Sequence, residues 1–308
     1  MHYKEIAGIA VMAALPVLAP GQVQLDLPER PADAPEGSEF FEEIRELSRE
    51  EREQRVLNEI ARGNVPEFLR ELVPVTVEGE ISGETESMTI HVTPDYMAIG
   101  SDEDFFRMPM SAPLAQQVAD LLDSSLPTRK IVNDIHEQAD MQFSPQPFSP
   151  EDYEIDTVEV FRLSHQAIEA QRGERPLGEL VSGIKKDIVV TAELPNRPPP
   201  RRVAIYGWHW PAGEPIQPPS LVHHEYYMDY SHGVRLVWNS IDVEGGTMTM
   251  REILADPVLH PLLSDEGPFD SSVYPVEEPY LLDTAGEPGG VEEGEGPERQ
   301  GQARHSVH

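Results

Sequence analysis

The apolar residues of this chain change their period twice along the sequence, and that change limits the folds open to it. Between residues 75 and 100, "VTVEGEIS" and "SMTIHVTPDYMAIG" alternate polar and apolar residues, which predicts a strand pair with a turn near Gly83. Three segments between residues 112 and 172 then repeat at helical spacing, and strand-like runs return after Gly183. Helices gathered between two strand groups indicate an α+β fold.

We therefore predict helices packed on a mostly antiparallel sheet or, as the alternative, on a small β-barrel-like C-terminal half. The runs "IKKDIVVTAEL" and "RRVAIYGWH" are joined by "PNRPPP", a proline turn that suits a hairpin loop and not a central strand. A single α+β domain is expected over 38–284, with a helical and strand-containing half at 38–176 and a β-rich half at 177–284.

Several helices carry recognisable start signals. In "SREEREQRVLNEIARGN", Ser48 and Glu51 have the spacing of a capping box, and the many charges predict a helix with a solvated face. Thr128 and Thr249 are placed to cap two further helices.

The two ends of the chain differ from the middle. Lys4 precedes an apolar run that is too short to span a bilayer and suits a secretory signal, so residues 1–22 are predicted to be a signal peptide. Residues 23–37 are expected to form a linker and 285–308 a disordered acidic tail. This predicts a secreted or periplasmic protein; an uncleaved anchor and a cytosolic chain are the alternatives.

Charge and cysteine content exclude several classes of function. The formal net charge of −33 would repel phosphate backbones and anionic lipid, so nucleic acid is excluded as a partner, and so is a membrane beyond an uncleaved leader. The chain has no cysteine, which rules out a disulfide framework, a thiolate zinc site and a cysteine nucleophile. The oligomeric state stays open.

Reactive side chains are concentrated between Lys185 and Arg235, where four of the eleven histidines fall within 24 residues. Histidine titrates near neutral pH, aromatic rings shape a pocket, and lysine and arginine hold negative charge. The candidate catalytic residues are His232, His209, Tyr230, Ser231 and Asp229. The candidate substrate-binding residues are Arg235, Lys185, Tyr206, Trp208 and His223.

Each of these residues has a plainer interpretation. His232 can tie a loop by hydrogen bonds, and Lys185 can form a surface salt bridge. A metal site is also open, because imidazole and carboxylate groups are common ligands, but the compact spacing His-x-x-x-His is missing. The cofactor is therefore left unassigned. His136 and His165 lie on amphipathic helical segments and are expected to be packing or surface residues.

The segment "YSHGVRL" resembles the signature of the L,D-transpeptidases, secreted enzymes that exchange peptide bonds in bacterial peptidoglycan. Ser231, His232 and Gly233 match that signature, and Arg235 could stand for its arginine, but Val234 occupies the place of the catalytic cysteine. The resemblance therefore implies a related β-fold without the family's mechanism. Over about residues 65–265 the chain also resembles a bacterial family of uncharacterised proteins, which implies one integrated domain.

We predict an exported hydrolase or transferase that acts on a cell-envelope or extracellular polymer, or on a small anionic ligand. In this hypothesis His232 is the general base or acid, His209 orients it or shares the role, and Arg235 with Lys185 holds negative charge. The first alternative is a non-catalytic module that binds a glycan or peptide in the same cleft. The second is a structural or scaffold protein.

Overall fold

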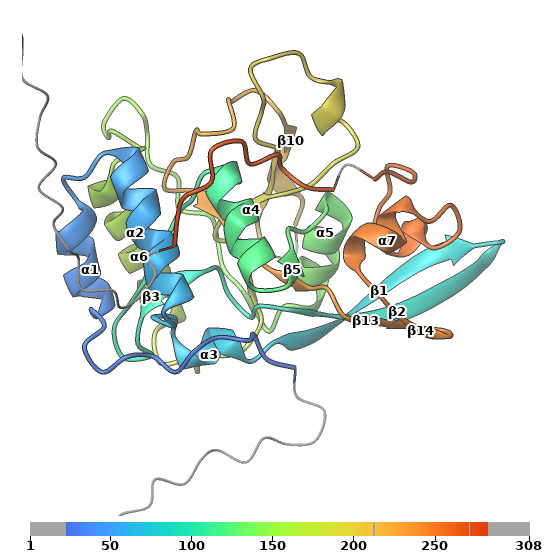
Figure 1. Ribbon diagram of the computed structural model, residues 1–308, viewed down its shortest axis with the longest axis horizontal. Coiled ribbons are helices and arrows are strands. Elements are labelled where there is room, and N and C mark those ends of the chain that lie inside the picture. Colours follow the sequence, from blue (N-terminus) through green and yellow to red (C-terminus); the bar gives the residue numbers. More distant parts are fainter. Residues whose placement is uncertain (1–22, 212, 271, 283–308) are drawn as a thin grey trace, which may run out of the picture.

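The computed structural model describes residues 23–211, 213–270 and 272–282, so the predicted signal peptide and acidic tail lie outside the described residues. The described part is an α+β fold, as predicted, with helices packed on several mainly antiparallel sheets (Figure 1). None of its helices is long and apolar enough to cross a membrane.

The helices are α1 (Gly37–Ile44), α2 (Arg49–Ala61), α3 (Glu67–Arg70), α4 (Ala112–Leu121), α5 (Arg129–Gln138), α6 (Val158–Arg172) and α7 (Met250–Ala255), with 3-10 turns η1 (Leu194–Asn196) and η2 (His260–Leu262). The strands of the first half are β1 (Val73–Ile81), β2 (Glu84–Val92), β3 (Ala98–Gly100), β4 (Phe105–Arg107), β5 (Ser124–Ser125) and β6 (Met141–Gln142). Those of the second half are β7 (Val181–Ser182), β8 (Lys186–Ile188), β9 (Ile205–His209), β10 (Pro215–Ser220), β11 (His232–Gly233), β12 (Val237–Trp238), β13 (Ile241–Val243) and β14 (Gly246–Met248).

Two four-stranded sheets organise the fold. The first has the order β1-β2-β12-β5, and its β1–β2 hairpin projects at one end with the α7–η2 segment packed beside it (Figure 1). The second has the order β10-β9-β8-β11, in which β8 is antiparallel to β9 and parallel to β11. Because β12 joins β2, the predicted halves share one sheet. The sheets of the described residues are open, so the structure has the antiparallel sheets that we predicted and not the barrel-like alternative.

The helix starts follow the capping chemistry of the sequence. Ser48, Thr128 and Thr249 each accept a hydrogen bond from the backbone N–H three residues further on, and Ser48 and Thr249 complete capping boxes. These helices therefore begin where the sequence predicts.

Helix α2 differs from its prediction in the position of two acidic side chains. Glu53 and Glu59 are fully buried, although we expected the acidic residues of this helix to face solvent. The Glu53 carboxylate accepts hydrogen bonds from the Ser111 backbone N–H at 2.7 Å and from the Tyr280 hydroxyl at 2.7 Å. Hydrogen bonds from packed segments make this burial tolerable, and they depend on tertiary structure that the helical pattern does not contain.

Residues 23–37, which we predicted to form a linker, pack against the domain, and the last of them, Gly37, begins α1. Leu25 is buried, and its backbone N–H donates to the Arg70 carbonyl at 2.9 Å. Arg30 Nε donates to Asn64 Oδ1 at 2.8 Å. At Gly63, where φ is +89°, a β-carbon would lie 2.3 Å from the Pro28 carbonyl oxygen, so only glycine allows this approach. This segment is therefore part of the folded unit.

A buried ion network links β4 to α6. Arg107, which is 1% exposed, donates to Asp95 at 3.0 and 2.6 Å and to Glu169 at 2.7 Å. Burial by itself would raise the pKa of Asp95, but the Arg107 guanidinium holds that pKa below its ordinary value. The network therefore stays charged inside the protein.

Candidate functional site

An open groove of about 710 Å³ lies where α5 packs on β9. We call it the histidine groove. Its lining comes from α5, β6, β9 and the start of β10, and comprises Asn133, His136, Glu137, Gln142, Tyr206, His209, Gly213, Glu214 and Pro215. Its volume is in the range typical of sites for small molecules. Two residues that the sequence selected, Tyr206 and His209, are among these.

An irregular backbone in β9 brings Tyr206 and His209 to the same side of the strand. In a regular strand, residues three apart point to opposite faces. Here Gly207 has φ of +107° and Trp208 has φ of +61°, so the alternation is broken. A positive φ is rare for a residue with a side chain, and such conformations are concentrated at functional sites. The local backbone conformation therefore allows both side chains to line the same groove.

The His209 ring is held on three sides. It stacks on the His136 ring with centroids 4.4 Å apart, and it lies nearly perpendicular to the Tyr206 ring with centroids 5.7 Å apart. His209 Nε2 lies 3.1 Å from Asn133 Oδ1, which also accepts a hydrogen bond from the Tyr206 hydroxyl at 2.8 Å. Because an amide oxygen only accepts, Nε2 carries the hydrogen and Nδ1 keeps its lone pair.

Both stacked histidines are neutral near pH 7. Burial, and then the neighbouring His136, lowers the pKa of His209 to about 4. Burial also lowers the pKa of His136, although the Trp210 backbone opposes that shift. His136 Nδ1 lies 2.7 Å from the Ser182 hydroxyl. The wall of the groove therefore contains two uncharged imidazole rings, and Nε2 of His136 is buried without a hydrogen-bond partner among the described residues.

Sequence reasoning missed Asn133 and His136, which hold His209 in place. We expected His136 to be a packing or surface residue, and it is a packing residue, since it is buried and stacks on His209 on the groove side of α5. The available signal was the spacing of Asn133, His136 and Glu137, which share one face of a helix. That signal selects a face of α5 and not the strand that covers it.

His232, the first choice from the sequence, is sealed inside the protein. It is 1% exposed, and among the described residues neither ring nitrogen has a hydrogen-bond partner. Tyr227 covers it with ring centroids 5.6 Å apart. Burial lowers the pKa of His232 to about 4, although Asp229 opposes the shift. This imidazole is a neutral, desolvated group without access to a substrate.

The neighbours of His232 are also engaged inside the protein. The Ser231 backbone N–H donates to Asp229 Oδ1 at 2.7 Å, and the Ser231 hydroxyl donates to the same oxygen. The Tyr230 hydroxyl accepts a hydrogen bond from the Phe148 N–H at 2.7 Å. Asp229, Tyr230 and Ser231 are all buried, so they serve the packing of this segment.

The two cations expected to hold a ligand point into the core. Lys185 Nζ donates to the Ser164 hydroxyl at 3.0 Å and to the Tyr230 carbonyl, and burial lowers the pKa of Lys185 to about 7. Arg235 donates to the carbonyls of Thr93 and Val181, each at 2.6 Å. Neither residue lines the histidine groove.

Trp208 and His223 lie apart from the groove as well. The Trp208 ring is buried beneath the Lys186 ammonium, at 4.8 Å from its centroid. His223 is exposed and stacks on Tyr227 at 4.0 Å. Of the ten candidates, the structure therefore places His209 and Tyr206 in the groove and the other eight outside its lining.

Neither a candidate metal site nor a similar protein helps to assign a function to the groove. Among the described residues, no group of three or more histidine or acidic side chains is placed to hold a metal ion. Comparison with family models, curated proteins and solved structures finds no match to the chain. The assignment of the site therefore depends on its own chemistry.

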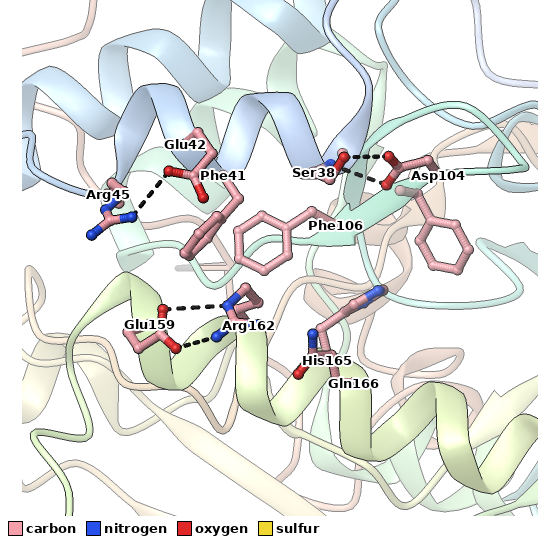
Figure 2. A pocket seen from close by; sticks show the side chains of 12 residues that line it. Ser38, Phe41, Glu42, Arg45, Asp104, Phe106, Glu159, Arg162, His165 and Gln166 are labelled. Carbon is pink, nitrogen blue, oxygen red and sulfur yellow. Dashed lines mark hydrogen bonds and ion pairs between the residues drawn. The ribbon is translucent and has the colours of Figure 1, made fainter.

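A second cavity, of about 550 Å³, lies between α1, α6 and β4 (Figure 2). Its charged side chains are paired across it or along each helix: Ser38 with Asp104, Arg45 with Glu42, and Arg162 with Glu159 (Figure 2). Phe41 and Phe106 form its apolar wall. Because its charged groups already have partners, this cavity is a weaker candidate than the histidine groove.

Replacing His232 with leucine is expected to leave the free energy of unfolding within about 1 kcal/mol of wild type at neutral pH, since the imidazole has no hydrogen bond to lose. The folded pKa of His232 is below the ordinary histidine value, so its contribution is complete above about pH 6.5 and is lost as pH falls toward 4. The variant should therefore lose less stability on acidification. Chemical denaturation of the variant and the wild type at neutral pH and near pH 4 tests this prediction. A large loss of the free energy of unfolding at neutral pH would contradict it.

Proposed function

We propose that the protein is an exported hydrolase or transferase that acts on a cell-envelope or extracellular polymer, with its reactive centre in the histidine groove. The observation that carries this proposal is the position of His209. It is a neutral imidazole, fixed by Asn133, on the wall of an open groove of about 710 Å³. A general base must reach the proton that it removes, and His209 lines the groove although only 4% of its surface is exposed, whereas His232 is 1% exposed and is not part of that lining.

The roles of the surrounding side chains follow from their contacts. His209 accepts a proton from water or a substrate hydroxyl at Nδ1, while Asn133 keeps the hydrogen on Nε2. The Tyr206 hydroxyl shares the Asn133 oxygen and so limits the movement of that amide. His136 stacks on one face of the His209 ring and is itself held by the Ser182 hydroxyl. Asn133 and His136 are positioning residues in this scheme.

The pH dependence of turnover tests the proposal. Because the pKa of His209 is about 4, its base form is present from neutral pH down to mildly acidic pH. We expect the wild-type protein to release product from a panel of envelope polymers with little change between pH 7 and 5, and to lose activity as pH approaches 4. Product release is measured by mass spectrometry. A midpoint near pH 6.5 would point to an unperturbed histidine and contradict the role of His209.

A non-catalytic glycan-binding module is the second candidate. Trp210, which directly follows His209, is 46% exposed, and an exposed indole is a common surface for packing sugar rings. Trp210 is not part of the groove lining, so this alternative predicts saturable binding of a glycan at the Trp210 surface with no product at any pH. The same panel of polymers distinguishes the two functions.

A further inference from the structure

We propose that a separate pocket of about 240 Å³, beside the 3-10 turn η1, binds a small amphipathic carboxylate, that is, a carboxylate group next to one apolar group. We call it the arginine pocket. It shares no lining residue with the histidine groove, so this proposal does not rest on the proposed function. Three features support it: the cations of its lining, its apolar walls and its fixed shape.

The arginine pocket gathers cations in a chain that has few of them. Arg197, Arg201 and Arg202 line it, although the chain has 23 lysines and arginines against 56 acidic residues. Arg201 is balanced, because its Nε lies 3.4 Å from Glu225 Oε2 and its Nη2 lies 2.5 Å from Glu277 Oε1. Arg197 and Arg202 form no ion pair with any described residue. Two guanidinium charges therefore remain without an acidic partner.

These two guanidinium groups keep donors for a ligand. Arg202 Nη1 donates to the Val222 carbonyl at 2.7 Å, an uncharged acceptor that leaves the positive charge in place. The Arg197 side chain is exposed, and no described residue accepts a hydrogen bond from it. Guanidinium groups bind carboxylates through paired, charge-assisted hydrogen bonds. A carboxylate that enters the pocket can therefore receive such bonds from both arginines.

The net charge of the chain limits the charge that the ligand carries. At about 0.1 M ionic strength, exposed charges more than about 10 Å away are largely screened, so the nearby arginines dominate the field inside the pocket. Outside it, the net charge of −33 repels anions, and a doubly charged phosphate is repelled more than a singly charged carboxylate. This favours the carboxylate.

The remaining lining of the arginine pocket is apolar and comprises Leu194, Pro195, Val273, Tyr274 and Pro275. Val273 is 37% exposed, so an apolar group that covers it removes valine surface from water. The volume is below the roughly 300–1,000 Å³ of sites for drug-sized ligands. One ring or branched alkyl group with its carboxylate therefore suits the space better than a polymer does.

The shape of the arginine pocket is fixed by the hydrogen bonds of Tyr274. Its hydroxyl donates to the Val189 carbonyl at 2.6 Å and accepts from the Ala204 backbone N–H at 2.9 Å. Its own backbone N–H donates to Gln116 Oε1 at 3.0 Å. The next residue, Pro275, has its φ restricted by its ring. A ligand therefore does not have to order this wall when it binds, which lowers the cost of binding.

Calorimetric titration of the full chain with four small probes at pH 7 tests the proposal. The probes are 3-phenylpropionate, its uncharged amide, acetate without an apolar group, and phenyl phosphate. We expect 3-phenylpropionate to bind at least about tenfold more tightly than the amide and acetate, and more tightly than phenyl phosphate. A smaller preference over the amide or acetate, tighter binding of phenyl phosphate, or no binding of 3-phenylpropionate would overturn the proposal.

A second pair of probes separates two sources of the same carboxylate chemistry. These are N-acetyl-glycyl-phenylalanine, which has a free terminal carboxylate, and its terminal amide. If the dipeptide acid binds at least as tightly as 3-phenylpropionate, the ligand is the C-terminus of a peptide. If it binds more weakly, the ligand is a free organic acid. Both results uphold the proposal, whereas equal affinity for the dipeptide acid and its amide would show that the carboxylate is not recognised.

A matched pair of variants checks that the two uncompensated arginines bind the carboxylate. Arg197→Gln with Arg202→Gln should weaken binding of 3-phenylpropionate at least about tenfold. Arg45→Gln with Arg251→Gln makes the same change in net charge at two exposed arginines outside the lining, and should keep affinity within about twofold. If the first variant does not fold, Arg197→Gln alone should still weaken binding about threefold.

Binding at the arginine pocket should also shift the NMR resonances of the Val273 methyl groups, because Val273 lines it. Unchanged Val273 resonances at saturation would place the probe elsewhere. Equal losses of affinity in the two double variants would show that net charge, and not the arginine pocket, attracts the probe. Either result would contradict the proposal.

Discussion

Replacing Arg107 with methionine is expected to lower the free energy of unfolding by about 3–5 kcal/mol, because it removes one partner of a buried ion network. Arg107 is 1% exposed and Asp95 is 2% exposed, so solvent cannot replace the lost contacts. Three hydrogen bonds to Asp95, at 2.6, 3.0 and 3.2 Å, disappear together with the one to Glu169 at 2.7 Å. Urea denaturation measures the change.

Two further variants show whether the uncompensated charge causes this loss. Arg45→Met removes a guanidinium whose partners, Glu42 and Glu46, are exposed, and should leave the denaturation curve unchanged. Adding Asp95→Asn to Arg107→Met removes the isolated charge and should recover part of the stability. A loss below about 1 kcal/mol for Arg107→Met would show that the network contributes little.

Replacing His209 with glutamine is expected to lower turnover by at least about 100-fold, the usual contribution of a positioned general base. Glutamine keeps a polar group opposite Asn133 but has no imidazole lone pair to accept a proton at neutral pH. Binding of the polymer should change much less, because the rest of the groove lining, including Tyr206 and His136, remains. His224→Gln is the matched control, since His224 is exposed and outside the groove lining.

The sequence contained enough information for most helices and for the main strand pair. Periodicity and caps located α2, α4, α5 and α6, and alternation located β1 and β2. The later strands were harder, because β8 covers Lys186–Ile188 and not the whole β-rich run around it. Its length is set by the neighbouring strands β9 and β11, which are far away in sequence.

The site was predictable only in part, for a related reason. His209 and Tyr206 were selected by residue type, but their meeting depends on the positive φ of Trp208, a conformation that its residue type does not suggest. Lys185 and Arg235 were expected to face a ligand because cations are scarce in this chain. In the structure they donate to buried groups, including three backbone carbonyls. Local patterns do not reveal such long-range partners.

The central claim is that His209 and not His232 is the reactive histidine, and one comparison of kcat/KM tests it most directly. The wild type, His209→Gln and His232→Leu are assayed on the same polymer that the wild type converts. The account predicts a loss of at least about 100-fold for His209→Gln, with KM little changed, and a value within about twofold of wild type for a folded His232→Leu. Retained activity in His209→Gln, with loss in His232→Leu, would contradict it.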